Sequence, residues 1–390
     1  MKTQHRSERP RQSFWQSVAR AWLRARSLVL AAALSLIAAS SAGCAVLQAA
    51  GSIPGPVACT STLLDDGQVL IAGGYAGPNT HATASAELYD PKTNAFVATG
   101  AMTAAREGHT ATRLEDGRVL VAGGGNYTNG APTDLTSAEL YDPKTGKFSQ
   151  TGSMTKDNGH QIANLLADGR VLIISSDRSA ELYDPKAGTF SRVGSMAVGH
   201  ESGAATLLND GRVLVAGGLD YQFHELSSAE VYNPMTRTFS PTESMSFKRS
   251  MLTETLLSDG RVLMAGGQAS YADTVAVAEV FDPSNGMFAR VGPMIEPRNM
   301  HAAVRLVDGR VLLVGGTNAA DRAIATAEVY DPKSATFAGT GSMSVPRFLP
   351  SATLLADGRV LVVGGQGNAG AVQGSAEIYD PKTGAFAQVG

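Results

Sequence analysis

The chain has 390 residues, of which 43% are apolar, so it is long enough to bury a large core. Its 43 glycines point to a turn-rich β protein rather than a helical one. After residue 43 the chain holds 25 Lys and Arg against 34 Asp and Glu, a net charge of −9, which argues against non-specific nucleic-acid binding because that requires a basic surface.

Residues 1–43 have the features of a secretory signal peptide. Six arginines between Arg6 and Arg26 precede a short apolar stretch, which is shorter than the roughly 20 residues that span a membrane. Ser41-Ala42-Gly43-Cys44 resembles a bacterial lipobox, although Ser41 stands where an aliphatic residue is usual. The resemblance implies cleavage before Cys44 and lipidation of that cysteine, with residues 44–55 as the linker. The alternative is ordinary cleavage nearby, which would release an unanchored protein.

Residues 56–390 repeat one sequence unit seven times. Each copy has a DG(R/Q)VL segment and, one loop later, an AE-x-(Y/F) segment that ends in Asp-Pro or Asn-Pro. The first Asp of each copy is Asp66, Asp116, Asp168, Asp210, Asp259, Asp308 or Asp357. From the aromatic residue of one copy to this Asp of the next is always 27 residues. All the variation in length falls between the two segments, so that region was free to diverge.

Each copy contains the pattern of four short strands, called a, b, c and d here. In the second copy they are expected at residues 109–114, 119–122 and 137–141, and from Phe148. Asp116-Gly117 predicts a tight hairpin with both residues at positive φ, and Asp142-Pro143 predicts a second turn. Strand b is apolar without alternation, as expected when both faces of a sheet are covered. Four antiparallel strands repeated seven times predict a β-propeller.

The DGRVLVAGG and AE-x-YDP segments and the aromatic seven residues later resemble the kelch repeat, and especially the kelch propeller of galactose-oxidase-like proteins. The resemblance covers about residues 56–390 and implies an all-β, seven-bladed kelch β-propeller with four antiparallel strands per blade. Family repeats usually carry Trp in strand d, where this chain has Phe148 and its equivalents. The first copy begins with strand a and the last ends with strand d. We therefore expect blade 1 to pack directly on blade 7 through side chains, with no shared closing strand.

The strand order places the two kinds of loop on opposite faces. The a–b and c–d turns share one face, called the turn face, and the b–c and d–a loops share the other, called the loop face. The b–c loop is shortest in blade 3, and its neighbours are rich in aromatic and hydrogen-bonding residues that suit a sugar or a peptide. The candidate ligand-binding residues here are Asn126, Tyr127, Asp177, Arg178, Tyr221, Phe223 and His224. The alternative is an ordinary solvated loop surface.

A second set of candidates lies in the d–a loops, ten residues before the first Asp of a copy. This position holds Arg106, Arg249, Arg298 and Arg347, and in blades 3 and 4 it holds Asn158 and His200, with His160 close in sequence to Asn158. A partial ring of guanidinium groups would favour an anionic ligand, such as an acidic sugar or peptide. The alternative is that each arginine binds loop carbonyls.

No catalytic residue, metal site or cofactor is predicted. The repeated aspartates have turn-forming roles, and the glutamates of strand c are expected to pair with the arginine that opens strand b, such as Arg118. His160, His200 and His224 form only a weak candidate for a transition-metal site. A copper-radical site like that of galactose oxidase requires a Cys cross-linked to a Tyr, and the only cysteine after Cys44 is Cys59, in a strand.

These features favour a non-enzymatic binding module of the bacterial cell envelope. It would be exported, anchored in the membrane through Cys44, and would hold a glycan or protein ligand on the loop face. One alternative is a sugar-modifying enzyme that resembles the kelch sialic-acid mutarotases or epimerases, with His200 or His160 beside Arg298 or Arg347. The other is a purely structural scaffold of the envelope.

Overall fold

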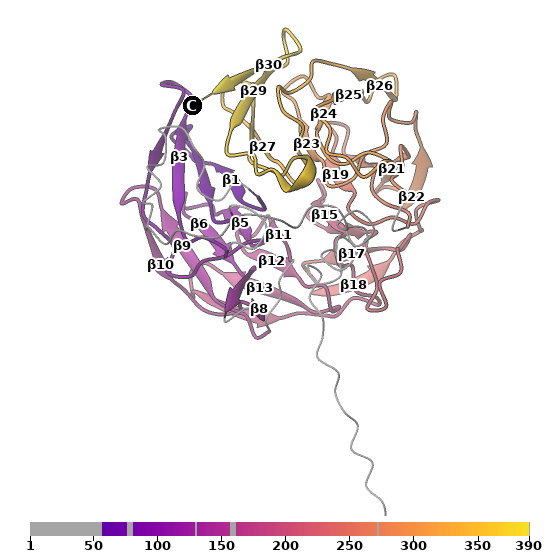
Figure 1. Cartoon of the computed structure of the whole chain (residues 1–390). Coiled ribbons are helices and arrows are strands. Elements are labelled where there is room, and N and C mark those ends of the chain that lie inside the picture. Colours follow the sequence, from indigo (N-terminus) through magenta and orange to yellow (C-terminus); the bar gives the residue numbers. More distant parts are fainter. Residues whose placement is uncertain (1–56, 76–80, 129–130, 157–160, 271–272, 390) are drawn as a thin grey trace, which may run out of the picture. The chain divides into compact units, whose positions relative to one another are not determined.

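The computed structural model describes residues 57–75, 81–128, 131–156, 161–270 and 273–389. The predicted signal peptide, the linker 44–55 and Cys44 lie outside these residues. The described residues form seven four-stranded antiparallel sheets arranged as blades around a central axis (Figure 1). The all-β, seven-bladed propeller predicted from the repeat is therefore confirmed. No helix among the described residues is long and apolar enough to cross a membrane.

The strands run outward from the axis in chain order within each blade, as the labels of Figure 1 show. Strands a are β1 (Thr60–Leu63), β5 (Thr110–Arg113), β11 (Ile162–Leu165), β15 (Ala204–Leu207), β19 (Thr253–Leu256), β23 (Ala302–Arg305) and β27 (Ser351–Leu354). Strands b are β2 (Val69–Ala72), β6 (Val119–Ala122), β12 (Val171–Ile174), β16 (Val213–Ala216), β20 (Val262–Ala265), β24 (Val311–Val314) and β28 (Val360–Val363).

The two outer strands complete each blade. Strands c are β3 (Ala86–Asp90), β9 (Ala138–Asp142), β13 (Ala180–Asp184), β17 (Ala229–Asn233), β21 (Ala278–Asp282), β25 (Ala327–Asp331) and β29 (Ala376–Asp380). Strands d are β4 (Ala95–Ala98), β10 (Lys147–Gln150), β14 (Thr189–Arg192), β18 (Thr238–Pro241), β22 (Met287–Arg290), β26 (Thr336–Gly339) and β30 (Ala385–Val389).

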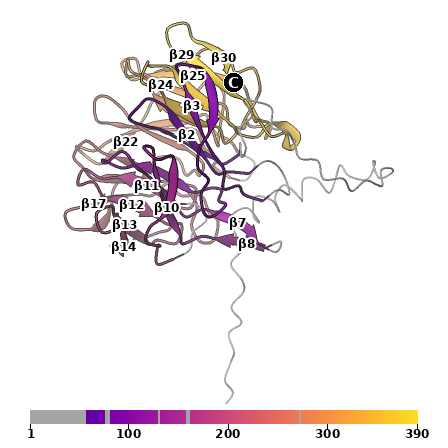
Figure 2. The same ribbon diagram turned by 90° about the vertical axis from the view of Figure 1, so that its left-hand side faces the viewer.

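Two b–c loops carry further structure, and both lie on the same side of the ring (Figure 2). In blade 2 a small hairpin forms from β7 (Gly125–Thr128) and β8 (Ala131–Asp134). In blade 7 a single 3-10 turn spans Asn368–Gly370. The loop face is thus where the blades differ in structure as well as in length.

The strand-b prediction is confirmed, because all four residues of every strand b are buried. The prediction for the a–b turn is partly wrong. Gly117 has a φ of 85°, but Asp116 is not at positive φ. The Gly117 N–H binds the Leu114 carbonyl at 3.1 Å, and the Asp116 carboxylate accepts the Arg118 N–H at 3.0 Å. Only one left-handed residue is needed, because the turn is three residues long with glycine in last place.

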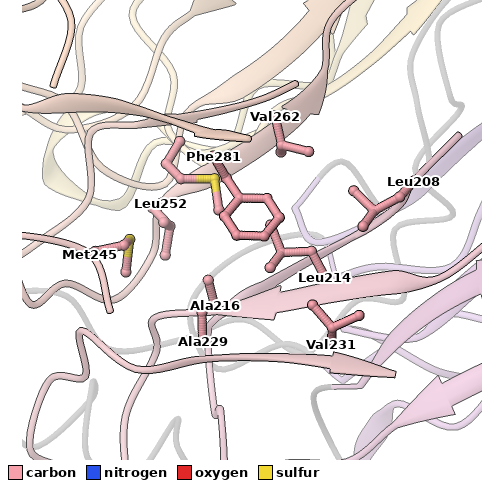
Figure 3. Close-up of a cluster of buried hydrophobic side chains, with 10 residues drawn as sticks. Leu208, Leu214, Ala216, Ala229, Val231, Met245, Leu252, Val262 and Phe281 are labelled. Atoms are coloured by element: carbon pink, nitrogen blue, oxygen red, sulfur yellow. The ribbon is translucent and has the colours of Figure 1, made fainter. Parts of the chain in front are cut away.

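The core is divided into seven apolar clusters, one between each pair of neighbouring blades. The cluster between blades 4 and 5, shown in Figure 3, joins Leu214 and Val231 of blade 4 to Val262 and Phe281 of blade 5, with Met245 from the d–a loop between them. A buried methionine of the d–a loop fills the same place in five other clusters. Each sheet therefore buries both faces against its neighbours, which fixes the ring.

Blade 1 closes directly against blade 7, as predicted. β1–β4 and β27–β30 form separate sheets that share no strand. The Ser61 hydroxyl lies 2.5 Å from that of Ser351 and 2.6 Å from that of Thr353. Cys59 and Tyr89 of blade 1 pack on Leu361 of blade 7 in the apolar cluster of this junction. Side chains hold the ring closed among the described residues.

Candidate functional site

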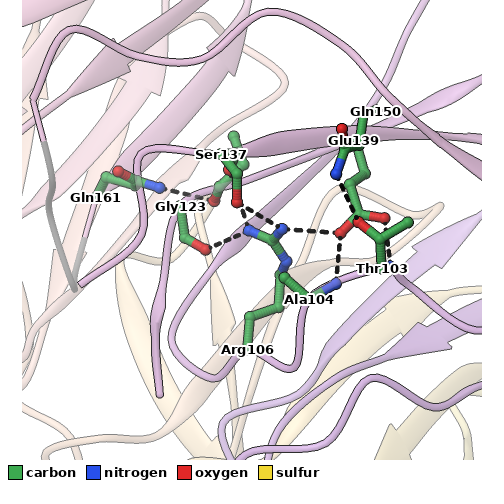
Figure 4. A network of polar contacts seen from close by, with 9 residues as sticks. Thr103, Ala104, Arg106, Gly123, Ser137, Glu139, Gln150 and Gln161 are labelled. Carbon is green, nitrogen blue, oxygen red and sulfur yellow. Dashed lines mark hydrogen bonds and ion pairs between the residues drawn. The ribbon is translucent and has the colours of Figure 1, made fainter. Parts of the chain in front are cut away.

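The four d–a arginines are completely buried and engaged within the fold. Each has a side chain that is 0% exposed. The Arg106 guanidinium lies 2.9 Å from the Glu139 carboxylate and donates to the carbonyls of Gly123 at 2.6 Å and Ser137 at 3.1 Å (Figure 4). The equivalent ion pairs are Arg249–Glu279 at 2.5 Å, Arg298–Glu328 at 2.8 Å and Arg347–Glu377 at 2.9 Å.

This geometry corrects two predictions. The arginines do not line an open surface, so they cannot form a ring that receives an anionic ligand. In four blades the strand-c glutamate pairs with one of these d–a arginines and not with the arginine that opens strand b. Arg118 instead binds Asp116 of its own hairpin at 2.7 Å, with both side chains partly exposed. The buried glutamate pairs with the arginine that is buried in the same junction, because an unpaired buried charge is costly.

His200 takes the place of the arginine in blade 4 and is also buried, with 3% of its surface exposed. Its Nδ1 lies 2.6 Å from the Gly217 carbonyl, and its Nε2 lies 3.6 Å from the Glu230 carboxylate. The imidazole thus substitutes for the guanidinium, with one bond to a carbonyl and one weaker contact to the glutamate. It is not available to a ligand on the loop face. Asn158 and His160 lie outside the described residues.

The short b–c loop of blade 3 is a tight turn between β12 and β13. The Asp177 carboxylate accepts the Ser179 N–H at 3.2 Å and forms an ion pair with Lys156. Arg178 has a φ of 79°, and its Nε donates to the Met196 carbonyl at 2.9 Å. Asp177 and Arg178 therefore shape the turn and tie it to the following d–a loop.

The b–c loop of blade 4 presents two exposed aromatic residues on the loop face. Tyr221 is 84% exposed and Phe223 is 45% exposed. Asp220 organises this loop, because its carboxylate accepts the backbone N–H groups of Gln222 at 2.7 Å and His224 at 3.0 Å. The His224 ring, which is 70% exposed, lies 3.2 Å from the same carboxylate. The hydrogen bonds of Asp220 therefore fix the turn that carries these aromatic groups.

The remaining candidates lie in blade 2. Asn126 and Tyr127 belong to β7, where they pair with Thr133 and Pro132 of β8. Asn126 is partly exposed, while the side chain of Tyr127 lies outside what the structure describes. The structure thus brings Tyr221, Phe223 and His224 together and places Asn126 on the loop of another blade.

Two carboxyl groups at the loop-face end of strand a were missed by the sequence reasoning. Glu107 is 7% exposed, and burial raises its pKa to about 7. Burial, with a smaller contribution from the negative charge of Asp134, raises the pKa of Glu201 to about 6. Both follow directly after the buried Arg106 or His200. The sequence did carry a signal, since this position holds acids in blades 2 and 4 but Val57, Gly159, Ser250, Asn299 and Phe348 in the other five copies.

A third missed carboxyl group lies in the wall of the channel. Glu254 of β19 stands where the other six strands a carry Ser or Ala. Its two carboxylate oxygens are buried and have no hydrogen-bond partner of good geometry among the described residues. Burial, only partly offset by the nearby Thr206 hydroxyl, the Ala216 backbone and the charge of Arg249, raises the pKa of Glu254 to about 8. This carboxyl is neutral at pH 7.

The residues do not suit a copper-radical centre. Cys59 is buried in the apolar cluster between blades 7 and 1, and burial raises the pKa of its thiol to about 12. His109 and His301 are also buried, and each ring binds a threonine of the preceding blade, Thr60 at 3.0 Å or Thr253 at 2.9 Å. Over the described ranges, no group of three or more His, Cys, Asp and Glu is placed to hold a metal ion.

Comparisons with known proteins support the assignment of the repeat. The Kelch motif matches residues 56–103, 116–155, 202–246 and 298–344, which fall on blades 1, 2, 4 and 6. No curated protein matches the sequence.

Many solved structures match the fold, and two illustrate the range. A fungal alcohol oxidase of the AA5 family, in complex with copper, has a TM-score of 0.67 and 18% identity over 86% of this chain and 77% of the oxidase. YjhT has a TM-score of 0.55 and 12% identity over 86% of this chain and 98% of YjhT. Identities this low show a shared fold and not a shared activity. The chain is therefore a seven-bladed β-propeller that carries Kelch motifs in four of its blades.

Proposed function

We propose that this propeller is a non-enzymatic binding module that holds a carbohydrate or protein ligand on its loop face. The exposed aromatic pair Tyr221 and Phe223, on a turn organised by Asp220, carries the proposal. Exposed aromatic side chains held in a fixed loop offer flat apolar surface for a sugar ring or an aliphatic side chain. Binding residues generally concentrate on such loops, positioned by a rigid scaffold.

Acidic side chains on blades 2 and 4 favour a neutral or basic ligand over an acidic one at this part of the loop face. The four d–a arginines that would attract an acidic ligand are buried. The groups that remain near the surface of blades 2 and 4 include the acids Asp134, Glu201 and Asp220. Carboxylates next to aromatic rings suit the hydroxyl groups of a neutral glycan, or a lysine or arginine of a peptide.

Glycan and peptide arrays probed with the full-length protein would identify the ligand. With the best ligand in hand, the double substitution of Tyr221→Ala and Phe223→Ala should weaken binding by about tenfold or more, as expected when aromatic anchors are lost. Met235→Ala is the matched control, because Met235 is 90% exposed but lies in a c–d turn on the turn face. Equal affinity of the double variant and the control would refute a loop-face site at blade 4.

A sugar-modifying enzyme is the second candidate, and the two perturbed carboxyl groups favour it. Glu107 and Glu201, with pKa values of about 7 and about 6, could exchange protons near neutral pH. His200, Arg298 and Arg347 are not proposed as catalytic residues, because all three side chains are buried and bonded within the fold. Conversion of a bound sugar by the wild type, lost in Glu201→Gln, would establish the enzyme; binding without conversion would favour the module.

We also propose that the protein is exported and anchored in the membrane of the cell envelope through a lipid on Cys44. The proposal rests on the basic and apolar segments before Cys44 and on the lipobox-like sequence around it. Growth with a labelled fatty acid should label the wild type but not Cys44→Ala. Equal labelling of the two would rule out the anchor.

A further inference from the structure

Glu254 is a charged residue at a repeat position where the other six strands a carry Ser or Ala. It lies beside Thr206 and Ala216 of blade 4, at the junction between blades 4 and 5 whose apolar cluster is shown in Figure 3. Ser61, at the same position in blade 1, bonds to two hydroxyl groups of blade 7 at 2.5 and 2.6 Å. Glu254 has no such partner of good geometry among the described residues, so its carboxyl is stable there only while it is neutral.

Arg249, five residues before Glu254, is held by fewer bonds than the other buried d–a arginines. Each of the other three donates to two backbone carbonyls. Within the described part of the chain, Arg249 donates to one carbonyl, that of Val277 at 2.9 Å, in addition to its pair with Glu279. Its charge also acts on Glu254, where it lowers the pKa against the effect of burial. Arg249 thus interacts with two carboxyl groups, although a single ionised carboxylate balances its charge.

The backbone of Arg249 holds both ends of the b–c loop of blade 4, residues 218–226. The Arg249 carbonyl accepts the Gly218 N–H at 2.8 Å, and the Arg249 N–H donates to the Leu226 carbonyl at 2.9 Å. The loop is closed by the Leu226 N–H, which donates to the Gly218 carbonyl at 2.8 Å. This loop carries the exposed aromatic pair of the loop face. A displacement of Arg249 toward Glu254 therefore acts on both ends of the loop that presents these aromatic groups.

The other titratable groups around Glu254 keep their charge near neutral and mildly alkaline pH. The strands β15, β16 and β20 carry no titratable residue. His301 binds Thr253, the neighbour of Glu254, and is neutral because burial and the charge of Arg298 lower its pKa to about 3. The remaining charged groups of the packed elements are Glu279 of β21, Arg290 of β22, Arg305 of β23, which donates to the Leu256 carbonyl at 3.1 Å, and exposed Lys248, 3.8 Å from Glu225. Glu254 is therefore the group of this junction whose charge changes as the pH rises through about 8.

We propose that Glu254 is a pH-operated switch for the b–c loop of blade 4. While Glu254 is neutral, Arg249 stays with Glu279 and the loop keeps the arrangement described above. When Glu254 releases its proton to solvent, the buried carboxylate requires charge-assisted hydrogen bonds, and it draws the Arg249 guanidinium toward itself. The backbone bonds of Arg249 to Gly218 and Leu226 then weaken, and the loop opens. The effect on a ligand rests on the proposed function of the loop face, whereas the change in the loop does not.

Millisecond hydrogen exchange of the unliganded full-length protein at pH 7 and pH 9 tests the switch, with each rate divided by the intrinsic rate at that pH. Protection of residues 218–226 should fall by about tenfold between pH 7 and pH 9 in the wild type, as expected when about one hydrogen bond is lost. Glu254→Gln, which stays neutral, should keep its protection at both pH values. Residues 316–324 of blade 6 are the internal control, because Arg347 bonds both ends of that loop in the same way while Ala352 stands in place of Glu254.

A second variant and a second readout complete the test. Glu254→Ala introduces the residue that five other blades carry and should also abolish the response to pH. Glu201, whose backbone bonds the same loop at Leu219, has a pKa of about 6 and is ionised at both pH values. The proposal is overturned if protection of residues 218–226 falls no more than that of residues 316–324, or falls equally in the wild type and Glu254→Gln.

The affinity for the ligand found on the arrays provides the second readout. Between pH 7 and pH 9 it should fall by about tenfold in the wild type and stay constant in Glu254→Gln, because the opened loop no longer presents Tyr221 and Phe223 in one arrangement. An equal fall in both proteins would contradict control of the ligand by Glu254. Binding that ignores the loss of both aromatic side chains would refute the loop-face site instead, and hydrogen exchange without ligand would still decide the switch.

Discussion

The turn face and the loop face are built from the same seven repeats, yet their recurring ion pairs differ in exposure. On the turn face, each hairpin Asp binds backbone N–H groups and in six blades an arginine two residues later, as in Asp308–Arg310 at 2.7 Å. On the loop face, the recurring arginines of the d–a loops are buried and form ion pairs with buried glutamates. Exposed groups on that face do not recur from blade to blade, as Tyr221, Phe223 and His224 in one loop show. The charged residues that recur stabilise the blades and their junctions. The residues that differ between blades are therefore the better candidates for a ligand site.

The largest expected effect separates buried from exposed arginines. Arg298→Ala leaves the Glu328 carboxylate buried without its cation and frees two carbonyls, so it should lower the free energy of unfolding by about 3–5 kcal/mol. Arg310→Ala breaks an exposed pair and should cost about 1 kcal/mol or less. Chemical denaturation of both variants measures the difference. Equal, small losses would mean that the buried pairs do not hold the blades together.

A smaller effect, visible only with changing pH, tests the wall of the channel. In the folded protein the pKa of Glu254 is raised from 4.5 to about 8, so the folded state binds more protons than the unfolded state between these values. Its contribution to stability is present below pH 4.5 and is lost as the pH rises through about 8. Glu254→Gln, which mimics the neutral acid, should be more stable than the wild type at pH 9 by a few kcal/mol and similar at pH 5.

Unfolding midpoints across this pH range check the prediction, with exposed Glu243→Gln as the matched control. If wild type and Glu254→Gln lose stability in parallel as the pH rises, Glu254 is not the group that is held neutral.

The smallest effect compares equivalent tyrosines. The Tyr141 hydroxyl lies 2.8 Å from the Thr99 hydroxyl, whereas the buried Tyr330 hydroxyl has no hydrogen-bond partner among the described residues. Blade 5 already has Phe281 at this position. Tyr141→Phe should therefore cost about 1 kcal/mol, and Tyr330→Phe should be neutral or slightly stabilising. Thermal unfolding distinguishes them; a larger loss for Tyr330→Phe would contradict the assignment.

The fold could be predicted from the sequence because its signals recur. The Asp-Gly turn, the apolar strand b and the Asp-Pro or Asn-Pro turn recur in register in seven copies. The number of blades, the strand order and the direct closure could therefore all be predicted. The a–b turn was predicted in the wrong class, because Asp-Gly alone does not reveal that Glu115 also belongs to the turn.

The candidate site was less predictable, because burial at a junction depends on two blades at once. Arg106 and Glu139 are 33 residues apart, and nothing in either local pattern shows that they meet in a closed junction. The same recurrence that suggested a ring of arginines was the better argument for a structural role. Glu107, Glu201 and Glu254 could have been found as positions where one or two copies depart from their equivalents.

Hydrogen–deuterium exchange on the full-length protein, with and without the best ligand from the arrays, tests most directly whether the loop face is the binding surface. The account predicts that protection concentrates on the blade 4 loop around Tyr221 and Phe223, while the a–b and c–d turns are unchanged. Protection confined to those turns, at segments such as Asp308–Arg310, would contradict it.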